Sequence, residues 1–287
     1  ANLSDEELLT LMGLTRDGKP TLAAVLCFSK YPQAQFPQLC LTAVLVPGTH
    51  MGDMAEDGQR FLNNKRIEGT IPQMVEGAVN FVARNMRAGV RIDNGKRIDV
   101  AEYPLTAVRE AIINALVHRD YSPYTEGTPV RLEMYQDRLE IVNAGGLYGA
   151  IDIDELGRIH ADTRNKTLVS VLETMKVVEN RYSGIPTIRK LFAENGLREP
   201  LFEDRHGLFR VVFYNAQTAK VTGDPETLEE YCKIPRSRKE VAVFLNMTQA
   251  YAMRRYVEPL IEQGVLAYTI PEKPQAHNQR IVTVPKE

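Results

Sequence analysis

The spacing of apolar residues predicts helices in several segments of the first 215 residues. Apolar positions three and four residues apart, typical of a helix with one buried face, recur in these segments. Helices are therefore expected at 72–86, 102–117, 166–178 and 185–195, and Gly196 closes the last of them. A shorter helix is expected at 3–14, where Ser4 precedes a run of acidic residues.

Apolar runs and alternating patterns predict strands between these helices. The runs at 21–28 and 39–46 are rich in apolar, β-prone residues and are interpreted as strands. Apolar residues alternate at 130–135 and 138–142, and Gln136-Asp137 forms a tight turn between the two. With a further strand at 208–214, the pattern predicts an α+β fold of two layers with an apparently antiparallel sheet.

A separate module is expected after a polar linker at 216–223. Three helix starts are signalled in residues 224–287: Pro225 in a first turn, a capping box of Ser237 and Glu240, and Thr248 as a cap. Pro259 should kink the third helix. Two strands follow, at 265–270 and 280–284. Three helices and then a β-hairpin is the order of a winged helix.

Basic residues are concentrated on the second and third helices of this module. Between Lys233 and Tyr256 six residues are basic and one is acidic, whereas residues 224–287 balance nine basic against nine acidic. Because the second helix of a helix-turn-helix pair enters the major groove, we predict that the module binds double-stranded DNA. The predicted contacts are Arg236, Arg238, Lys239, Gln249, Tyr251, Arg254, Arg255, Lys273 and Arg280. The alternative is a winged helix used for protein–protein contact or domain packing.

Composition narrows the class of protein further. A length of 287 residues suits about two domains, and a net charge of -2 excludes a protein that coats DNA by bulk charge. No apolar run reaches the roughly 20 residues that a membrane span needs, so no membrane association is expected. The three cysteines, which form no C-x-x-C pair, fit a reducing cytoplasm and neither a disulfide framework nor a zinc site.

One helix carries a second, polar face. Glu110, Asn114 and His118 recur at intervals of four residues and therefore share one side of the helix at 102–117 and its end. For an isolated Glu and Asn at this spacing, a solvated face is the ordinary interpretation.

The surroundings of that helix resemble a known arrangement. The stretch PLTAVREAIINALVHRDY at 104–121 resembles the helix that carries the catalytic Glu and the metal-binding Asn in ATPases of the GHKL superfamily. It is followed by RLEIVNAGGL at 138–147, TRN at 163–165 and RYSGI at 181–185. This order is similar to that of bacterial and archaeal transcriptional regulators described as RecG-like or Schlafen-type, over roughly residues 3–287.

The resemblance implies a GHKL-like sandwich at 102–215, led by an α/β segment at 1–101, and a site for ATP with Mg²⁺. Glu110 would activate water, and Asn114 would hold Mg²⁺ through its carbonyl oxygen. Glycine turns would let backbone N–H groups approach the nucleotide. The implied nucleotide-binding residues are Asn114, His118, Asn143, Gly145, Gly146, Ser183 and Gly184. We expect Glu110 and Asn114 to share a cleft with the Gly145-Gly146 turn.

Two departures from the superfamily pattern predict weak or absent ATP turnover. Asn143 stands where nucleotide-binding relatives place an Asp that accepts the adenine amino hydrogen, and a neutral hydrogen bond is weaker than a charged one. Tyr182 replaces the first glycine of the G-x-G turn, where its ring could fill the phosphate pocket. The sequence thus leaves open whether the chain uses ATP with Mg²⁺ or has no cofactor.

We therefore interpret the chain as the carboxy-terminal part of a longer DNA-binding transcriptional regulator, acting as a homodimer, in which the sandwich senses a nucleotide effector or carries the oligomer interface. Residues 2–10 should then pack poorly or lean on a neighbouring chain, because relatives usually carry a further amino-terminal domain. The alternative is an ATPase or helicase-related enzyme that docks on nucleic acid through the winged helix, although no G-x-x-x-x-G-K-[ST] loop is present. A third interpretation is an interaction module with an inactive nucleotide pocket.

Overall fold

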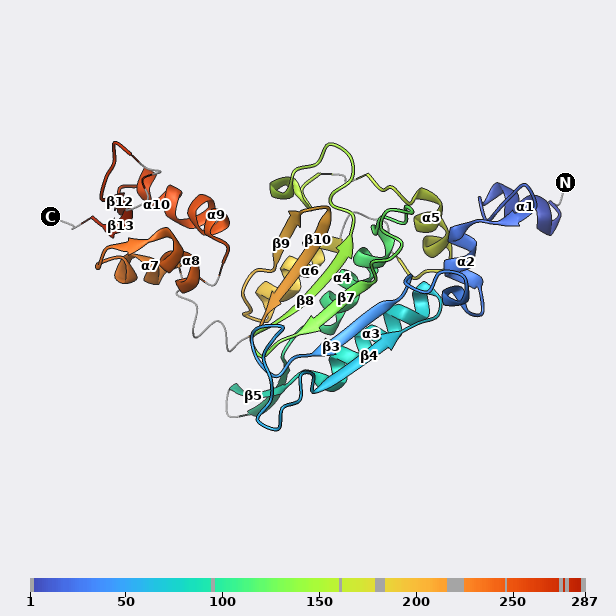
Figure 1. Cartoon of the computed structure of the whole chain (residues 1–287), viewed down its shortest axis with the longest axis horizontal. Coiled ribbons are helices and arrows are strands. Elements are labelled where there is room, and N and C mark those ends of the chain that lie inside the picture. The colour runs from blue at the N-terminus through green and yellow to red at the C-terminus, as the bar shows by residue number, and fades with distance from the viewer. Residues whose placement is uncertain are drawn as a thin grey trace. The chain divides into compact units, whose positions relative to one another are not determined.

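The computed structural model describes residues 3–93, 96–159, 162–178, 184–215, 225–245, 247–273, 276 and 279–284. The chain forms two compact units, residues 1–215 and 216–287, which are described separately below (Figure 1). The linker expected at 216–223 lies outside the described residues.

A six-stranded sheet with the order β4-β3-β7-β8-β10-β9 forms one layer of the first unit (Figure 1). Its strands are β3 (Leu41–Leu45), β4 (Asn63–Ile67), β7 (Val130–Met134), β8 (Arg138–Ala144), β9 (Leu201–Arg205) and β10 (Leu208–Tyr214). The hairpin of β7 and β8 confirms the turn expected at Gln136-Asp137. The expectation of an antiparallel sheet is wrong at one position, because β3 pairs in parallel with β7. A parallel pair needs a long crossover, and two helices lie between these strands in the chain.

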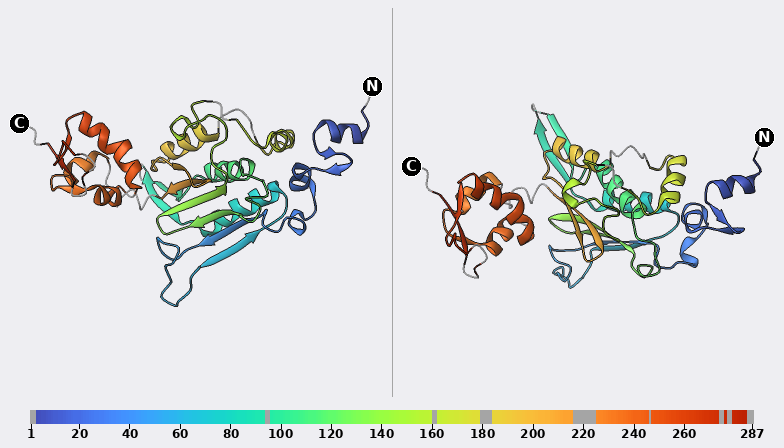
Figure 2. Two further views of the ribbon diagram at one scale, coloured as in Figure 1. Left: turned by 45° about the horizontal axis from the view of Figure 1, so that its top comes forward. Right: turned by 90° about the horizontal axis from the view of Figure 1, so that it is seen from above.

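Three helices cover one face of this sheet (Figures 1 and 2). They are α3 (Ile71–Asn85), α4 (Leu105–Val117) and α6 (Gly184–Glu194), and α4 contacts both of the others. Ile112 and Leu116 of α4 and Met74 of α3 belong to one buried core with Leu132 and Ile141 of the sheet. The helices expected at 72–86, 102–117 and 185–195 are confirmed within one to three residues at their ends, and the two-layer α+β arrangement is confirmed with them.

The run at 21–28 is a helix, α2 (Leu22–Phe28), and our expectation of a strand there is wrong. The Thr21 hydroxyl accepts a hydrogen bond from the amide of Ala24, which caps the first turn. Leu26 and Cys27 are its buried side chains. A short apolar run suits a buried strand and a helix equally well, and here the cap decides between them.

The amino-terminal segment has little contact with a core. Helix α1 (Asp5–Leu11) begins with the capping box of Ser4 and Glu7 and has no buried residue. Its Leu11 is 74% exposed, and the loose packing expected at 2–10 holds for the described residues there. A two-stranded ribbon of β1 (Thr15–Arg16) and β2 (Lys19–Pro20) follows it.

The remaining elements of the first unit connect these layers. They are η1 (Pro32–Ala34), the hairpin of β5 (Ala88–Asp93) and β6 (Lys96–Ala101), η2 (Ile153–Glu155) and α5 (Lys166–Thr174). The helix expected at 166–178 therefore ends earlier, and Lys176 has a positive φ of 57° that cannot continue a helix. In the described residues, no helix is long and apolar enough to cross a bilayer.

The second unit contains helices followed by a small sheet. Its elements are α7 (Pro225–Tyr231), β11 (Arg236–Ser237), α8 (Arg238–Phe244), α9 (Gln249–Ala252), η4 (Met253–Val257), α10 (Glu258–Glu262), β12 (Leu266–Tyr268) and β13 (Arg280–Thr283). Ser237 and Glu240 form the expected capping box, and Thr248 caps α9. The three strands form a sheet with the order β11-β13-β12. The helices pack on this sheet through a buried core that includes Leu228, Val241 and Ile281.

The third helical segment of this unit is interrupted before Pro259. Residues Met253–Val257 form a π-helical turn between α9 and α10. A proline has no N–H to bond to the carbonyl four residues earlier, and its ring crowds that carbonyl, so the hydrogen-bond ladder must change register. The irregularity expected at Pro259 thus takes the form of a π-helical turn.

Candidate functional site

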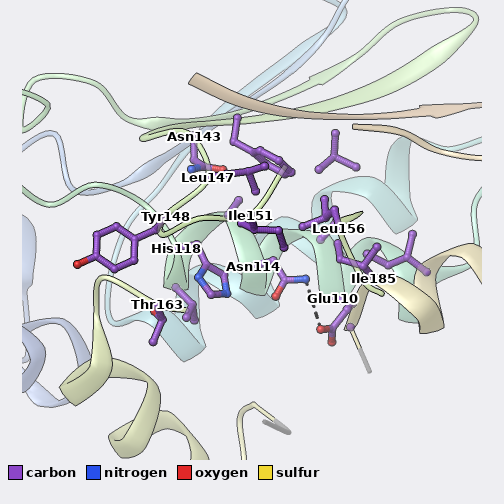
Figure 3. Close-up of a pocket in the computed structure, with 18 of the residues that line it drawn as sticks. Glu110, Asn114, His118, Asn143, Leu147, Tyr148, Ile151, Leu156, Thr163 and Ile185 are labelled. Carbon is purple, nitrogen blue, oxygen red and sulfur yellow. Dashed lines mark hydrogen bonds between the residues drawn. The ribbon is translucent and has the colours of Figure 1, made fainter. Parts of the chain in front are cut away.

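Helix α4 brings the polar residues at intervals of four into one pocket with the glycine turn after β8. Glu110, Asn114, His118, Gly145 and Gly146 all line a cavity of about 210 Å³ in the first unit (Figure 3). The expectation that Glu110 and Asn114 share a cleft with the Gly145-Gly146 turn is confirmed. The polar side of α4 therefore faces a pocket and is not an ordinary solvated face.

Glu110 and Asn114 lie against the start of α6. The Asn114 side-chain nitrogen donates a hydrogen bond of 3.4 Å to Glu110 Oε1 (Figure 3). A Cβ atom at Gly184, the first residue of α6, would collide with the same Oε1 atom and lie 3.2 Å from Asn114 Nδ2. A side chain at position 184 would therefore displace the Glu110 carboxylate. Tyr182 and Ser183, also part of the expected site, lie outside the described residues.

Asn143 places an amide at another wall of the pocket. It lies in β8, is 3% exposed, and its nitrogen donates to the carbonyl oxygens of Ala144 (3.1 Å) and Gly145 (3.3 Å). These two bonds assign the amide orientation and direct Oδ1 away from the backbone. Since Asn143 lines the pocket, Oδ1 is placed to accept a hydrogen bond from a ligand.

His118 ends α4 and lines the pocket as a neutral imidazole. Burial, with the positive charge of Arg164 as the smaller cause, lowers the pKa of His118 below its usual value. The ring can therefore donate or accept one hydrogen bond at neutral pH, and it does not supply a positive charge for phosphate.

Two backbone amides at the glycine turn after β8, which we expected to approach a nucleotide, donate to groups of the protein itself. The amide of Gly145 donates to the Gly207 carbonyl oxygen at 2.7 Å, and the amide of Leu147 donates to Asp204 Oδ2 at 2.9 Å. A Cβ atom at Gly146 would collide with the Asp204 carboxylate. Sequence reasoning missed Asp204, because it enters the site only through the pairing of β9 with β10 and of β10 with β8.

The Arg-Asn element at 164–165 supports the site from behind. Arg164 donates to the Gly146 carbonyl oxygen at 2.5 Å, lies 3.8 Å from Asp120, and packs over the Tyr148 ring. Asn165 donates to the carbonyl oxygens of Val117 and Arg119 at the end of α4. These residues fix the glycine turn and the end of α4, so their described contacts are structural.

The walls of the pocket are mostly apolar. Aliphatic side chains such as Leu147, Ile151, Leu156 and Ile185 form much of the wall (Figure 3). Asp162 and Thr163 line it as well. Among the described residues, no group of three or more His, Cys, Asp or Glu side chains could hold a metal ion. The Glu110 carboxylate and the Asn114 carbonyl oxygen are ligands of the type that Mg²⁺ prefers.

The predicted DNA contacts fall into two groups in the second unit. Lys239, Gln249, Arg254, Arg255 and Lys273 are exposed. Arg236, Arg238 and Tyr251 are half-buried. Arg236 packs over the Tyr231 ring at 4.2 Å, and Arg238 over the Tyr268 ring at 5.8 Å. Arg280 is exposed but pairs with Glu240 at 2.7 Å. An exposed pair of this kind contributes little to stability, so a phosphate could replace the carboxylate.

Comparison with known proteins identifies similarity for part of the first unit. Residues 127–213 match the model of a family described as "Putative ATP-dependent DNA helicase recG C-terminal". The match spans β7 to β10 and begins after the helix that carries Glu110 and Asn114. A search of curated proteins finds no match.

A solved structure has a similar fold over nearly the whole chain. It is the crystal structure of the DIP2311 protein from Corynebacterium diphtheriae, with a TM-score of 0.60 and 16% identity, covering 98% of this chain. The chain corresponds to 58% of that protein's crystallised chain. At this identity the likeness concerns the fold alone. Residues 127–213 are thus similar to a RecG-type ATPase-like domain, and the mixed α+β sheet of the first unit fits such a fold.

Proposed function

We propose that the protein is a DNA-binding transcriptional regulator whose second unit is a winged helix. The observation that carries the proposal is the exposure of Arg254 and Arg255 on the helical segment after the Thr248 cap. In this interpretation, α8 and the segment from α9 to α10 form the helix-turn-helix pair, and β12 and β13 form the wing. The order of elements and the local excess of basic residues both support it.

The segment from α9 to η4 would enter the major groove. Gln249 lies at its amino-terminal end, from which recognition helices read base edges. Arg255 lies one to two turns further on and can pair with a guanine through two hydrogen bonds. Lys239 and Lys273 are exposed on other elements and would contact phosphates. Arg236 and Arg238 would contribute less than the sequence implies, because both are half-buried and pack on tyrosine rings. Arg255 also lies over a ring, that of Tyr256 at 6.0 Å, but it is exposed.

The pocket of the first unit would bind the effector. It combines an apolar wall with a few convergent polar groups, which is the usual composition of a small-molecule site. The family resemblance suggests that this effector is a nucleotide with Mg²⁺. The protein would bind its operator as a homodimer. In the GHKL-like interpretation, Asn143 accepts from the base and Asn114 provides an oxygen for the metal ion.

The alternative function is an ATPase or helicase-related enzyme that uses the second unit to dock on nucleic acid. The description of the matching family and the position of Glu110 in the pocket favour it. Against it, the Leu147 amide already donates to the Asp204 carboxylate of the protein. We therefore expect ATP turnover to be weak or absent.

Selection of DNA by the intact chain tests the proposal. The protein is incubated with fragmented genomic DNA, bound fragments are sequenced, and the affinity for an enriched duplex is measured. We expect one or a few enriched sites, with Arg255→Ala weakening binding about fivefold or more, because one bidentate arginine–guanine pair gives about 1–3 kcal/mol of discrimination. Lys190→Ala, which removes an exposed charge on α6, is the control and should leave the affinity unchanged. Enrichment of no sequence would contradict specific DNA recognition.

A further inference from the structure

We infer that the pocket of the first unit selects an uncharged ring compound with an N–H donor, such as a nucleoside, and that phosphate groups add no affinity. The inference rests on the proposed role of the first unit in binding an effector. It differs from the ATP site implied by the family resemblance in the chemical class of the ligand. Three sets of contacts at the pocket support it.

The first set concerns the amides of Gly145 and Leu147 at the glycine turn, which donate to acceptors of the protein itself and are therefore not open to a phosphate. The Leu147 amide is bound to Asp204 at 2.9 Å, and the Gly145 amide is bound to Gly207 at 2.7 Å. A phosphate at this turn would displace the Asp204 carboxylate or lie beside it. Both arrangements are unfavourable, because the first leaves a charge without its donor and the second places two anions together.

The second set concerns the start of α6, where the helix dipole favours an anion. Glu110 already places a carboxylate there, since its Oε1 atom is so close to Gly184 that a Cβ atom would collide with it. The carboxylate therefore takes the place in which a phosphate would profit from the dipole. Asn114 donates a long hydrogen bond of 3.4 Å to the same carboxylate oxygen.

The described wall also offers a triphosphate no cation. Among the described lining residues none is Lys or Arg, and Asp162 is already paired with Lys166 at 3.6 Å. His118 is held neutral because burial lowers its pKa. The nearby Arg164 is engaged by the Gly146 carbonyl oxygen and by Asp120.

The third set favours a ring with an N–H donor. Aliphatic side chains from β10, the segment after the glycine turn and α6 line the pocket, as expected for a site that takes an apolar ring. Leu147, Ile151 and Ile185 are among them (Figure 3). Oδ1 of the buried Asn143 is an acceptor at the edge of this space, since the amide nitrogen is committed to two backbone carbonyls. A ligand with an exocyclic amine satisfies this acceptor, whereas a purely apolar ring leaves it without a partner.

Calorimetric titration of the intact chain without DNA tests the inference with adenosine, purine riboside and ATP, each with and without Mg²⁺. We expect ATP to bind no more tightly than adenosine and Mg²⁺ to have no effect. Purine riboside, which lacks the exocyclic amine, should bind about three- to tenfold more weakly, which is the cost of one neutral hydrogen bond. ATP binding tenfold tighter than adenosine, or dependent on Mg²⁺, would overturn the inference while leaving the effector role intact.

A variant of Asp204 tests whether this carboxylate excludes phosphate from the pocket. Asp204→Asn keeps an acceptor for the Leu147 amide and removes the charge, so ATP should gain about three- to tenfold in affinity relative to adenosine. Glu194→Gln makes the same change of charge at an exposed position of α6 and should leave the ratio unchanged. An unchanged ratio in Asp204→Asn would contradict the exclusion of phosphate by this carboxylate. If none of the three compounds binds, both the inference and the effector role are overturned. The proposed DNA binding is tested by a separate measurement and does not depend on this result.

Discussion

The side-chain amide of Asn165 donates a hydrogen bond of 2.7 Å to the carbonyl oxygen of Val117, the last residue of α4. A second bond of 2.8 Å reaches the carbonyl oxygen of Arg119. The last carbonyl groups of a helix have no hydrogen-bond donor within the helix. Here the Asn165 side chain supplies a donor for two carbonyl groups at the end of α4, those of Val117 and Arg119. The helix that carries Glu110 and Asn114 is thereby fixed at its pocket end.

Loss of this amide should destabilise the first unit. Asn165→Ala leaves two carbonyl groups without a donor, and we expect the free energy of unfolding to fall by about 1–3 kcal/mol. Asn195→Ala is the matched control, because Asn195 also donates to a helical carbonyl but is exposed, and its loss should cost less. Urea denaturation followed by circular dichroism measures both. An equal effect of the two substitutions would show that Asn165 does not hold the end of α4.

A side chain at Gly184 should disturb the pocket. Gly184→Ala forces Glu110 or the start of α6 to move, because the added Cβ would collide with Glu110 Oε1. Overpacking costs about 1–3 kcal/mol of stability, and the cost here should lie at the lower end, because Glu110 Oε1 ends a flexible side chain that can turn aside. Gly127→Ala adds a methyl group where nothing lies within 4 Å and should change stability by less than about 0.5 kcal/mol. Thermal denaturation compares the two variants, and a Gly184→Ala variant no less stable than Gly127→Ala would contradict overpacking at position 184.

The cysteine thiols should be unreactive in the folded protein. All three are buried, and burial raises the pKa of Cys27 and that of Cys232 to about 11 each. Burial also raises the pKa of Cys40. Because the thiolate is the reactive form, a disulfide reagent at pH 8 should label none of them at an appreciable rate until denaturant is added, when three should react. Rapid labelling without denaturant would contradict this burial.

Acidification should weaken the first unit through His118. Its pKa is lower in the folded protein than in the unfolded chain, mainly because of burial, so the unfolded chain takes up this proton first. The free energy of unfolding should therefore fall as the pH drops below about 6.5. Above that pH the neutral His118 makes its full contribution to stability. His118→Gln should remove that part of the pH dependence. A stability curve of unchanged slope in the variant would show that His118 titrates normally.

Much of the first unit could be predicted from the sequence, because long amphipathic helices and alternating strands have distinctive patterns. The main helices and the hairpin of β7 and β8 are examples. Two elements could not be predicted on this basis. The run at 21–28 is apolar on all sides and fits either a helix or a strand. The strand β4 (Asn63–Ile67) is polar in four of its five residues and lies at the sheet edge, so it has no alternating pattern.

The candidate site also contains residues that the sequence could predict and residues that it could not. The spacing of Glu110, Asn114 and His118 placed them on one side of α4, and the pocket lies on that side. The contact of Asp204 with the glycine turn could not be foreseen, because Phe209 of β10 pairs with both Asn143 and Asp204 and thus joins segments distant in the chain. In the second unit, charge alone could not separate the exposed Arg255 from Arg236, whose guanidinium packs on a ring.

The salt dependence of DNA binding tests the central claim most directly. The affinity of the intact chain for an enriched duplex is measured between 50 and 200 mM salt, alongside Lys239→Ala, Lys273→Ala and Arg255→Ala. Each phosphate contact adds about 0.9 to the slope of log affinity against log salt. We predict a steep decrease for the native chain and a slope smaller by about one for each lysine variant. Affinity independent of salt, or slopes unchanged in all three variants, would contradict DNA binding by this surface.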